Sequence, residues 1–304
     1  MRMNRKVDIK TYLSEKKRLV EDGLETLMLK ADGPFAGHIE AMRYSLFVGG
    51  KRVRPILCLA AGEAIDNGQN TGQSLLPVAC ALECIHTYSL IHDDLPAMDD
   101  DSLRRGKPTN HTLFGEAGAI LAGDGLLTLA FDLLSDPRHT AIPAERRLKI
   151  IQTIARAAGP VGMVGGQALD IANENSTYPF TTLQTIHRSK TGALITASVL
   201  AGAIGAGASA GQLERLTQYS DRIGLAFQIV DDLLNATSTT EQLGKAAGSD
   251  ADRGKATYPA YFGIEETKEK AKEAVAAAVA TLSDFDDKAD PLRQLAEYIY
   301  ARNH

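Results

Sequence analysis

The sequence predicts an all-α fold, and three observations indicate it. Apolar residues recur at helical spacing wherever a periodicity can be recognised. No segment alternates convincingly at the period of two that is typical of a half-buried strand. Glycine and proline separate the periodic segments at short intervals along the 304 residues. The chain is therefore expected to contain many helices joined by short connections.

These breaking residues delimit the predicted helices. In chain order, the expected helices are 39–47, 74–92, 117–134, 145–158, 181–204, 212–234 and 266–282. The breakers around them are Gly49-Gly50, Pro96, Asp136-Pro137, Gly159-Pro160, Tyr178-Pro179, Gly248 and Pro259. The last helix contains AKEAVAAAVATL, which is rich in helix formers and is expected to support the scaffold. No linker or composition shift divides the chain, so residues 1–304 are expected to form a single domain.

One uncharged segment could be taken for a membrane span. Residues 191–213 carry no charge and are long enough to cross a bilayer. Their second half is Gly, Ala and Ser rather than large apolar residues, so transfer into lipid would be weak. A buried helix followed by a small-residue loop is the better interpretation, and no membrane span is expected.

Composition narrows the function classes. With 44% hydrophobic and 23% charged residues the chain is typical of a soluble globular protein. A net charge of −5 argues against a nucleic-acid binder, so an anionic ligand must be met by local cations. The three cysteines form no CxxC motif and suit reduced thiols. The charged N-terminal segment lacks the apolar stretch of a secretory signal, so a cytoplasmic location is expected.

Two Asp-Asp pairs carry the clearest chemical signal. Asp93-Asp94 and Asp231-Asp232 each end an apolar run, and a Gly-Lys dipeptide follows each at the same distance, 13 residues (106 − 93 and 244 − 231). We call residues 93–107 the first aspartate motif and residues 231–245 the second. One pair alone would indicate a solvated helix end. Because Mg²⁺ is usually held by one or two carboxylates and substrate phosphates, the repeat predicts a site that bridges Mg²⁺ to phosphate.

The first aspartate motif contains a third acid that a continuous helix would misplace. Asp99 follows Asp93 by six residues, which on an unbroken helix would turn it largely away. The intervening Leu95-Pro96-Ala97-Met98 segment takes the chain out of helical register. We therefore expect Asp99 to return beside Asp93, with Arg104, Arg105 and Lys107 supplying cations for phosphate.

Three further polar groups accompany the motifs. Asp231 and Asn235 are four residues apart and are expected on one helical face. Gly49-Gly50-Lys51-Arg52-Val53-Arg54-Pro55 lacks the features of a P-loop and is either a solvated basic turn or a second phosphate site. His187-Arg188-Ser189-Lys190-Thr191-Gly192 places a cation and a hydroxyl at the start of the uncharged segment, where a simple polar helix start is the alternative.

Together these segments resemble the trans-isoprenyl diphosphate synthases, and within them the bacterial farnesyl diphosphate synthases. The resemblance spans essentially the whole chain, through GGKRVRP, ALECIHTYSLIHDDLPAMDDDSLRRGKPTNH, GMVGGQALD, HRSKTGAL, FQIVDDLLN and LGKAAGSDADRGKATYP in order. It implies an all-α isoprenoid synthase fold around a deep central cavity, a homodimer, and the two aspartate motifs facing each other across that cavity.

The resemblance also implies roles for individual residues. Asp93, Asp94 and Asp99 would serve two Mg²⁺ ions on the allylic diphosphate, and Asp231 a third. The residues expected around the allylic substrate are Arg104, Lys190, Thr191, Gln228, Lys245 and Lys255. Those expected at the isopentenyl diphosphate site are Lys51, Arg54, His86 and Arg105. Thr191 and Gln228 would face the developing allylic cation with their oxygens.

Product length is expected to depend on Tyr88 and Ser89, which precede Asp93 by five and four residues. At 1.5 Å per residue, Tyr88 lies about 7.5 Å from Asp93 along the helix, where its ring could close the cavity floor. In the resembled family this pattern, with the Pro-Ala insertion, is similar to enzymes that stop at fifteen carbons. Plain core packing is the alternative for Tyr88.

One position departs from the family pattern. The second motif usually reads DDxxD, and here Asn235 replaces its last acid. If that position binds metal-bound water the change should be tolerated, and if it ligates metal directly the affinity for the third Mg²⁺ should fall. We expect tolerance. Three alternatives remain: a geranylgeranyl diphosphate synthase, a non-catalytic partner subunit that Asn235 alone favours, and a terpene cyclase, which would not need Lys51, Arg54 and Arg105.

Overall fold

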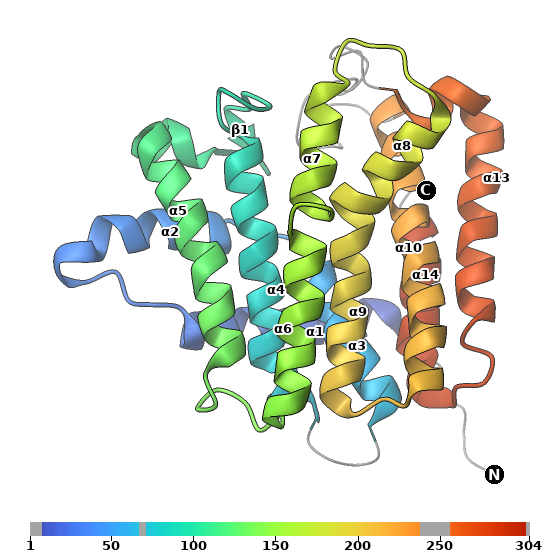
Figure 1. The fold of residues 1–304 in the computed structure, drawn as a ribbon, viewed down its shortest axis with the longest axis horizontal. Coiled ribbons are helices and arrows are strands. Elements are labelled where there is room, and N and C mark those ends of the chain that lie inside the picture. Colours follow the sequence, from blue (N-terminus) through green and yellow to red (C-terminus); the bar gives the residue numbers. More distant parts are fainter. Residues whose placement is uncertain (1–7, 67–70, 238–255, 302–304) are drawn as a thin grey trace.

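The structure is a computed structural model that describes residues 8–66, 71–237 and 256–301. Helices make up almost all of the regular structure in these ranges, which confirms the all-α prediction (Figure 1). The α-helices are α1 (Ile9–Leu27), α2 (Ala36–Phe47), α3 (Val53–Ile65), α4 (Thr71–Asp93), α5 (Asn110–Ser135), α6 (Ala144–Ala158), α7 (Met163–Ala172), α8 (Phe180–Ile186), α9 (Ala193–Ala206), α10 (Ala210–Thr237), α13 (Tyr258–Ala280) and α14 (Asp290–Ala301). The short elements are the 3-10 helices η1 (Gly33–Phe35) and η3 (Asp287–Ala289), the π-helix η2 (His187–Gly192), and the antiparallel strands β1 (Leu103–Arg104) and β2 (Lys107–Pro108).

The helices expected from periodicity are present with shifted ends, except that the one expected over 181–204 is divided into α8, the π-helix η2 and α9. The uncharged segment forms α9 after the π-helix η2, and α9 ends at Gly207, whose φ of 88° suits glycine. The periodicity does not predict α1, α3, α7 or α14. Most residues of α3 are buried, from Pro55 through Gly62, so it has no polar face to create a contrast.

The apolar core forms two clusters that meet at α3 and α9. One cluster joins α1, α2, α4, α5 and α6, and the other joins α8, α10, α13 and α14. Both α3 and α9 contribute buried residues to each cluster. The two helices approach closely, because a Cβ at Gly202 would lie 1.9 Å from the carbonyl oxygen of Cys58. This contact ties the two halves of the bundle together.

Three segments are long and apolar enough to cross a membrane by length and composition: Gly72–Asp93, Asn110–Ser135 and Phe180–Ala206. Of their most apolar windows, 72%, 44% and 56% respectively are buried inside the fold. The uncharged segment belongs to the third of them. Its apolar side chains, such as Leu194 and Val199, are fully enclosed by neighbouring helices. Core packing therefore accounts for the lack of charge there.

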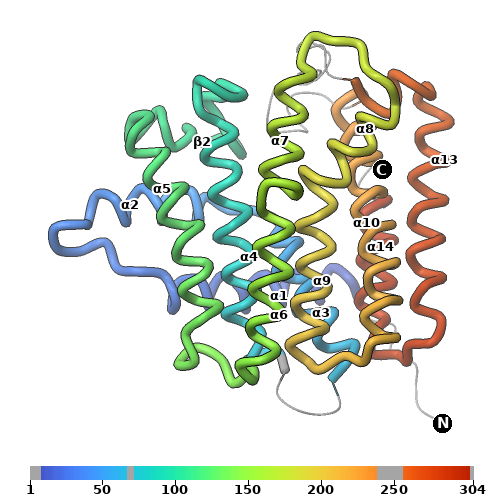
Figure 2. Tube along the Cα trace, in the orientation of Figure 1, coloured from blue at the N-terminus to red at the C-terminus, as the bar shows by residue number. Residues whose placement is uncertain are grey.

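The helices that carry the two aspartate motifs end at the same end of the bundle. The α4 helix and the α10 helix both rise toward the top of Figure 1, and the trace in Figure 2 shows their C-terminal ends beside the β1–β2 hairpin and above α8 respectively. The helices α7 and α8 and the π-helix lie between them. Two motifs 138 residues apart (231 − 93) are thus brought to one side of the molecule.

Candidate active site

The first aspartate motif begins where α4 ends, and its third acid returns as the insertion predicts. The amide of Asp99 donates a 2.8 Å hydrogen bond to the carbonyl oxygen of Asp93. The amides of Met98 and Asp100 both donate to the carbonyl of Leu95, which closes a tight loop around Pro96. Asp100 adopts a left-handed φ of 50° in that loop. Both Asp93 and Asp99 consequently line the same cavity.

The second acid of the pair, Asp94, is buried and paired with Arg104. Asp94 is 3% exposed, and both of its carboxylate oxygens accept 2.8 Å hydrogen bonds from Arg104 Nε. The Arg104 guanidinium reaches it from β1, and Asp101 lies 3.9 Å away as a weaker partner. A guanidinium matches a carboxylate in geometry and charge. Asp94 therefore anchors the hairpin to α4 rather than lining the main cavity, while Arg104 itself also lines it.

The hairpin turn brings a second arginine to the glycine-rich loop. Arg105 and Gly106 form the turn with φ values of 54° and 73°, a pair of positive angles typical of a type I′ hairpin. The Arg105 guanidinium donates to the carbonyl of Gly49, and a Cβ at Gly50 would lie 2.8 Å from Arg105 Nη1. Glycine at position 50 is needed for this approach.

The basic loop contributes one residue that sequence reasoning missed. Arg52 has a left-handed φ of 51°, which turns its side chain inward, where it is 3% exposed. It donates to Glu83 Oε1 at 2.6 Å and to the carbonyl of Leu46 at 2.8 Å. Lys51 is exposed and is not among the described residues that line the cavity. The only available signal was the buried acid Glu83 in the middle of an apolar helix.

Arg54 and His86 face the cavity from α3 and α4. Burial lowers the pKa of Arg54 to about 10, with Glu83 acting in the opposite direction. Burial also lowers the pKa of His86 well below its usual value, and Arg54 and Arg105 add to that effect. A neutral imidazole beside arginines is a hydrogen-bonding group and not a charge. These residues, with Arg105, form the cationic wall of the cavity.

The opposite wall comes from α10. Gln228 and Asp231 line the cavity, and Asp231 is exposed. Asp232 is buried, and its Oδ2 accepts a 2.8 Å hydrogen bond from the amide of Tyr258 at the start of α13. Asn235 follows Asp231 by four residues in the continuous helix α10, as expected, but it is 7% exposed and is not among the described residues that line the cavity. Lys245 and Lys255 lie outside the described residues.

The π-helix supplies the wall between α4 and α10. Lys190 and Thr191 line the cavity, and Lys190 Nζ donates to Asp170 Oδ2 of α7 at 2.7 Å. A Cβ at Gly166 would lie 2.3 Å from the amide nitrogen of Lys190, so α7 packs directly on the π-helix. Such π-helical turns are frequent at functional sites. Asp170 belongs to the GMVGGQALD motif, to which the sequence assigned no individual role.

The lining residues named above, from α3, α4, the hairpin, α7, the π-helix and α10, surround one cavity of about 740 Å³. Its volume lies within the usual range for small-molecule sites, about 300–1,000 Å³. Tyr88 and Ser89 line it one turn below Asp93, and Tyr88 is 5% exposed. The Ser89 hydroxyl donates to the carbonyl of His86 at 2.8 Å. Burial, and then the charge of Asp93, raises the pKa of Tyr88 to about 12, so its hydroxyl stays protonated.

The acids of the cavity fit a magnesium site that substrate completes. Within residues 8–66, 71–237 and 256–301, no three His, Cys, Asp or Glu side chains converge closely enough to hold a metal alone. Mg²⁺ commonly takes only one or two carboxylates and fills its octahedron with water and substrate phosphate. Burial raises the pKa of Asp93 to about 6; Lys190 opposes this and Asp99 adds to it. A cation beside Asp93 and Asp99 would relieve the cost of holding that charge in a buried place.

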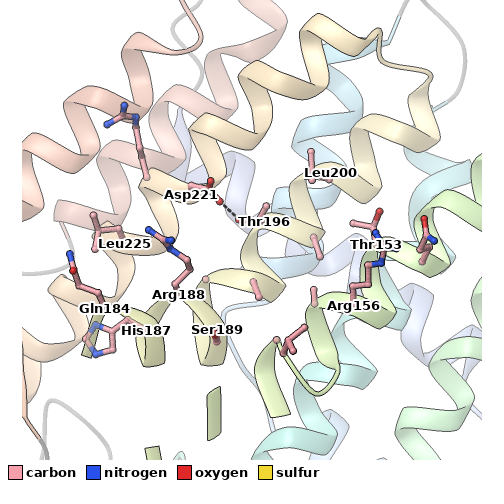
Figure 3. Close-up of a pocket in the computed structure, with 18 residues that line it drawn as sticks. Thr153, Arg156, Gln184, His187, Arg188, Ser189, Thr196, Leu200, Asp221 and Leu225 are labelled. Atoms are coloured by element: carbon pink, nitrogen blue, oxygen red, sulfur yellow. Dashed lines mark hydrogen bonds between the residues drawn. The ribbon is translucent and has the colours of Figure 1, made fainter. Parts of the chain in front are cut away.

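A second cavity, of about 660 Å³, lies on the other face of the π-helix (Figure 3). Arg156, Arg188 and Leu225 border it, and the Thr196 hydroxyl donates to Asp221 at 3.0 Å across it. His187 lines both cavities. Of the predicted site residues that the structure describes, none lines this second cavity, so the candidate site is the one between the aspartate motifs.

Comparison with known proteins gives a consistent assignment. The polyprenyl synthetase family model matches residues 38–298. A farnesyl diphosphate synthase of Geobacillus stearothermophilus is 47% identical over 298 residues, covering 98% of this chain and 99% of that protein. A geranylgeranyl diphosphate synthase of Cyanophora paradoxa is 48% identical over 295 residues, covering 97% and 96%. The crystal structure of an FPP/GFPP synthase from Zymomonas mobilis superposes with a TM-score of 0.85 at 41% identity, covering 97% of this chain and 99% of that one.

Proposed function

The chain belongs to the polyprenyl synthetase family and is a trans-prenyltransferase, and from that premise we propose that it is a farnesyl diphosphate synthase. In this proposal it condenses isopentenyl diphosphate with dimethylallyl diphosphate and then with geranyl diphosphate. The relatives support the transferase class, but their names differ in product length. The choice of the fifteen-carbon product therefore depends on this chain's own cavity.

The position of Tyr88 carries that choice. Its buried ring lines the cavity, about 7.5 Å along α4 from Asp93 at the helical rise per residue. An aromatic ring fills space that a longer prenyl chain would need. Plain core packing would account for its burial but not for its place on the cavity wall.

We assign the allylic diphosphate to the end of the cavity where the aspartate motifs meet. Asp93 and Asp99 would hold Mg²⁺ on one side and Asp231 on the other, with Lys190 and Arg104 beside them. Mg²⁺, of which we expect three ions, supplies charge neutralisation of the diphosphate when bound. Gln228 and Thr191 would direct their oxygens at the allylic carbons. The expectations for Lys245 and Lys255 at this substrate, and for Asp94 as a supporting ligand, stay predictions.

We assign isopentenyl diphosphate to the cationic wall. Arg54 and Arg105 would bind its diphosphate, the neutral imidazole of His86 would donate a hydrogen bond, and Lys51 would reach in from the exposed loop. Arg52 and Glu83 act behind them by fixing the loop from within the core. The described residues of this wall supply cations and no cluster of acids. A diphosphate is negatively charged, so it would be attracted to such a wall.

The proposed reaction needs no side chain of the protein to act as a base. The allylic carbon–oxygen bond breaks and leaves a carbocation, while the diphosphate departs with the electron pair. The double bond of isopentenyl diphosphate forms the new carbon–carbon bond. A proton is lost from the adjacent carbon, and the departing diphosphate accepts it. Preorganised charge around the leaving group provides the stabilisation that such a step requires.

We also propose that the chain works as a cytoplasmic, single-domain homodimer without a membrane span. Large apolar side chains are exposed on several helices, including Leu121 at 57%, Leu148 at 67% and Val161 at 85%. They belong to α5, α6 and the turn that follows it. Exposed large apolar side chains on neighbouring helices suit an interface when they gather into one patch. A second copy of the chain would cover it.

Product analysis tests the proposed function. The purified chain is incubated with Mg²⁺, isopentenyl diphosphate and dimethylallyl diphosphate, and the prenyl chains are separated by length. We expect fifteen carbons to dominate, and Tyr88→Ala to lengthen the product. Tyr298→Ala, in α14 and away from the cavity, serves as the matched control. A dominant twenty-carbon product from the wild type would favour the geranylgeranyl alternative, and no turnover without a second, homologous subunit would favour the non-catalytic one.

A further inference from the structure

The side chain of His92 lies between the proposed floor of the cavity and the neighbouring helix α5. Tyr88 and His92 are four residues apart on α4 and so share one face of that helix. Their rings meet edge to face, with centroids 5.7 Å apart and planes at 78°. Both side chains line the main cavity. Edge-to-face pairs at this separation are attractive and fix the relative orientation of the two rings.

The other side of the His92 ring is fixed to α5. His92 Nε2 lies 3.0 Å from the carbonyl oxygen of Ile120. A carbonyl can only accept, so Nε2 carries the hydrogen and donates. Asp124 Oδ1 lies 4.0 Å from the same nitrogen, on the next turn of α5. The imidazole therefore connects the aromatic floor residue to the backbone of a second helix.

A glycine on α5 makes this connection sterically feasible. A Cβ built at Gly123 would lie 2.1 Å from His92 Nε2 and 2.5 Å from its Cδ2. Contacts this short do not occur, so any side chain at position 123 would displace the imidazole. Gly123 is buried within α5, where glycine is otherwise less favourable than alanine by roughly 1 kcal/mol. Its helical backbone gives no other reason for glycine.

We propose that His92 is a positioning residue for product length, which holds Tyr88 at the cavity floor by bridging it to α5 in the space left by Gly123. This inference rests on the proposed function. The maximum length of the prenyl product then depends on how α4 packs against α5, and not on Tyr88 alone. His92 acts through Tyr88 and needs no contact with the reacting atoms.

Product ratios and a double variant test this role. His92→Ala should raise the ratio of twenty- to fifteen-carbon product about tenfold, which corresponds to about 1.4 kcal/mol between competing steps. Gly123→Ala should change the ratio in the same direction, with Gly211→Ala, where a Cβ meets nothing within 4 Å, as the matched control. In a Tyr88→Ala background, His92→Ala should add less than about twofold, because coupled neighbours are not additive.

The possible outcomes separate the two proposals. If Tyr88→Ala lengthens the product and His92→Ala leaves it unchanged, the role of His92 is wrong and the proposed function stands. An equal effect of His92→Ala in both backgrounds also overturns it, because His92 would then act independently of Tyr88. Should His92→Ala not fold, His92→Phe keeps a ring without the donor and should show a smaller shift.

A readout independent of product covers failure of the proposed function. If the wild type makes no prenyl product, the proposed function fails. The structural role of His92 is then decided by denaturant unfolding of wild type, Tyr88→Ala, His92→Ala and the double variant. Non-additive unfolding free energies would support the bridge, and additive ones would exclude it.

Discussion

The two aspartate motifs share a division of labour but differ in how the chain continues after the acids. In each pair the first acid, Asp93 or Asp231, lines the cavity, and the second is buried and anchors a later segment, although Asp232 also borders the cavity and Asp94 does not. Asp94 is held by a guanidinium from the hairpin, whereas Asp232 accepts a neutral amide hydrogen bond from Tyr258. After Asp93 the chain leaves the helix and Asp99 returns to the cavity; after Asp231 the helix continues to Thr237.

This difference shows that the break in the helix, which returns Asp99 to the cavity, adds a carboxylate that a continuous helix would turn away. A residue four positions on in a continuous helix turns by about 400°, which moves it some 40° around the axis and 6 Å along it. Asn235 is buried at that position. Asp99 lies six positions on, yet its backbone is hydrogen-bonded to Asp93. Among the described residues, the first motif lines the cavity with Asp93, Asp99 and Asp101, and the second with Asp231 and the buried Asp232.

Replacing the cavity-facing acids should have the largest effect. We expect Asp93→Asn to lower kcat by about 1,000-fold and Asp231→Asn by about 100-fold, the range found when one group that stabilises developing charge is removed. Steady-state rates at saturating substrates and several Mg²⁺ concentrations provide the measurement. Asp100→Asn is the control, because Asp100 is exposed, does not line the cavity and has a left-handed φ that asparagine tolerates. Equal losses at both motifs would contradict the asymmetry.

Replacing Asp94 or Asp232 with asparagine should distinguish the ion pair that holds Asp94 from the hydrogen bond that holds Asp232. Asp94→Asn removes the negative charge and one of the two acceptor oxygens that pair with the largely buried Arg104, and we expect a loss of about 3 kcal/mol in the free energy of unfolding. Asp232→Asn keeps an oxygen that can accept from the Tyr258 amide, so about 1 kcal/mol is expected. Urea unfolding of both variants gives the comparison. A larger loss for Asp232→Asn would show that its charge matters more than the hydrogen bond.

A histidine beside the second motif should make stability depend on pH. His187 is stacked on Tyr258 and lies 3.9 Å from Asp232. Burial lowers its pKa to about 4; Asp170 opposes this and Lys190 adds to it. The folded protein binds this proton less tightly than the unfolded chain does. The contribution of the neutral His187 side chain to the free energy of unfolding is therefore fully present above pH 6.5 and is lost as the pH falls toward 4.

Between pH 7 and pH 5, the contribution of His187 to the free energy of unfolding should fall by about 2 kcal/mol. The difference between wild type and His187→Gln in unfolding free energy over that interval isolates it from the titration of carboxylates. We expect a smaller pH dependence in the variant. Identical pH profiles would mean that the folded protein accommodates a charged imidazole.

Restoring the missing acid should have the smallest effect on activity. Asn235→Asp would place a carboxylate at a position that is 7% exposed and not on the described cavity wall. We expect the Mg²⁺ concentration for half-maximal activity to change by less than about twofold. A carboxylate raises the affinity for Mg²⁺ when it ligates the ion directly, and position 235 is not on the described cavity wall. Stability should fall by about 1–3 kcal/mol from burial of the charge. A tenfold gain in apparent Mg²⁺ affinity would show that position 235 reaches the metal.

The sequence predicted those features of the site that depend only on local backbone geometry. The return of Asp99 follows from helical periodicity and from the effect of proline, both of which act within a few residues. The inward turn of Arg52 was not predictable, because the partner that attracts it, Glu83, is 31 residues away in the chain. The pairing of Lys190 with Asp170 likewise depends on how closely Gly166 lets α7 approach the π-helix.

The sequence by itself determined the helical class, the cluster of acids and cations at the end of α4, and the family. Its motifs are short, and each is defined by residues whose spacing is fixed by the helix or by a turn. Only the tertiary structure decided that Asp232 borders the cavity while Asp94 does not, which arginine of the basic loop turns inward, and how His92 reaches α5. Side-chain direction at a helix end depends on the partners that compete for it, and those partners come from helices distant in the chain.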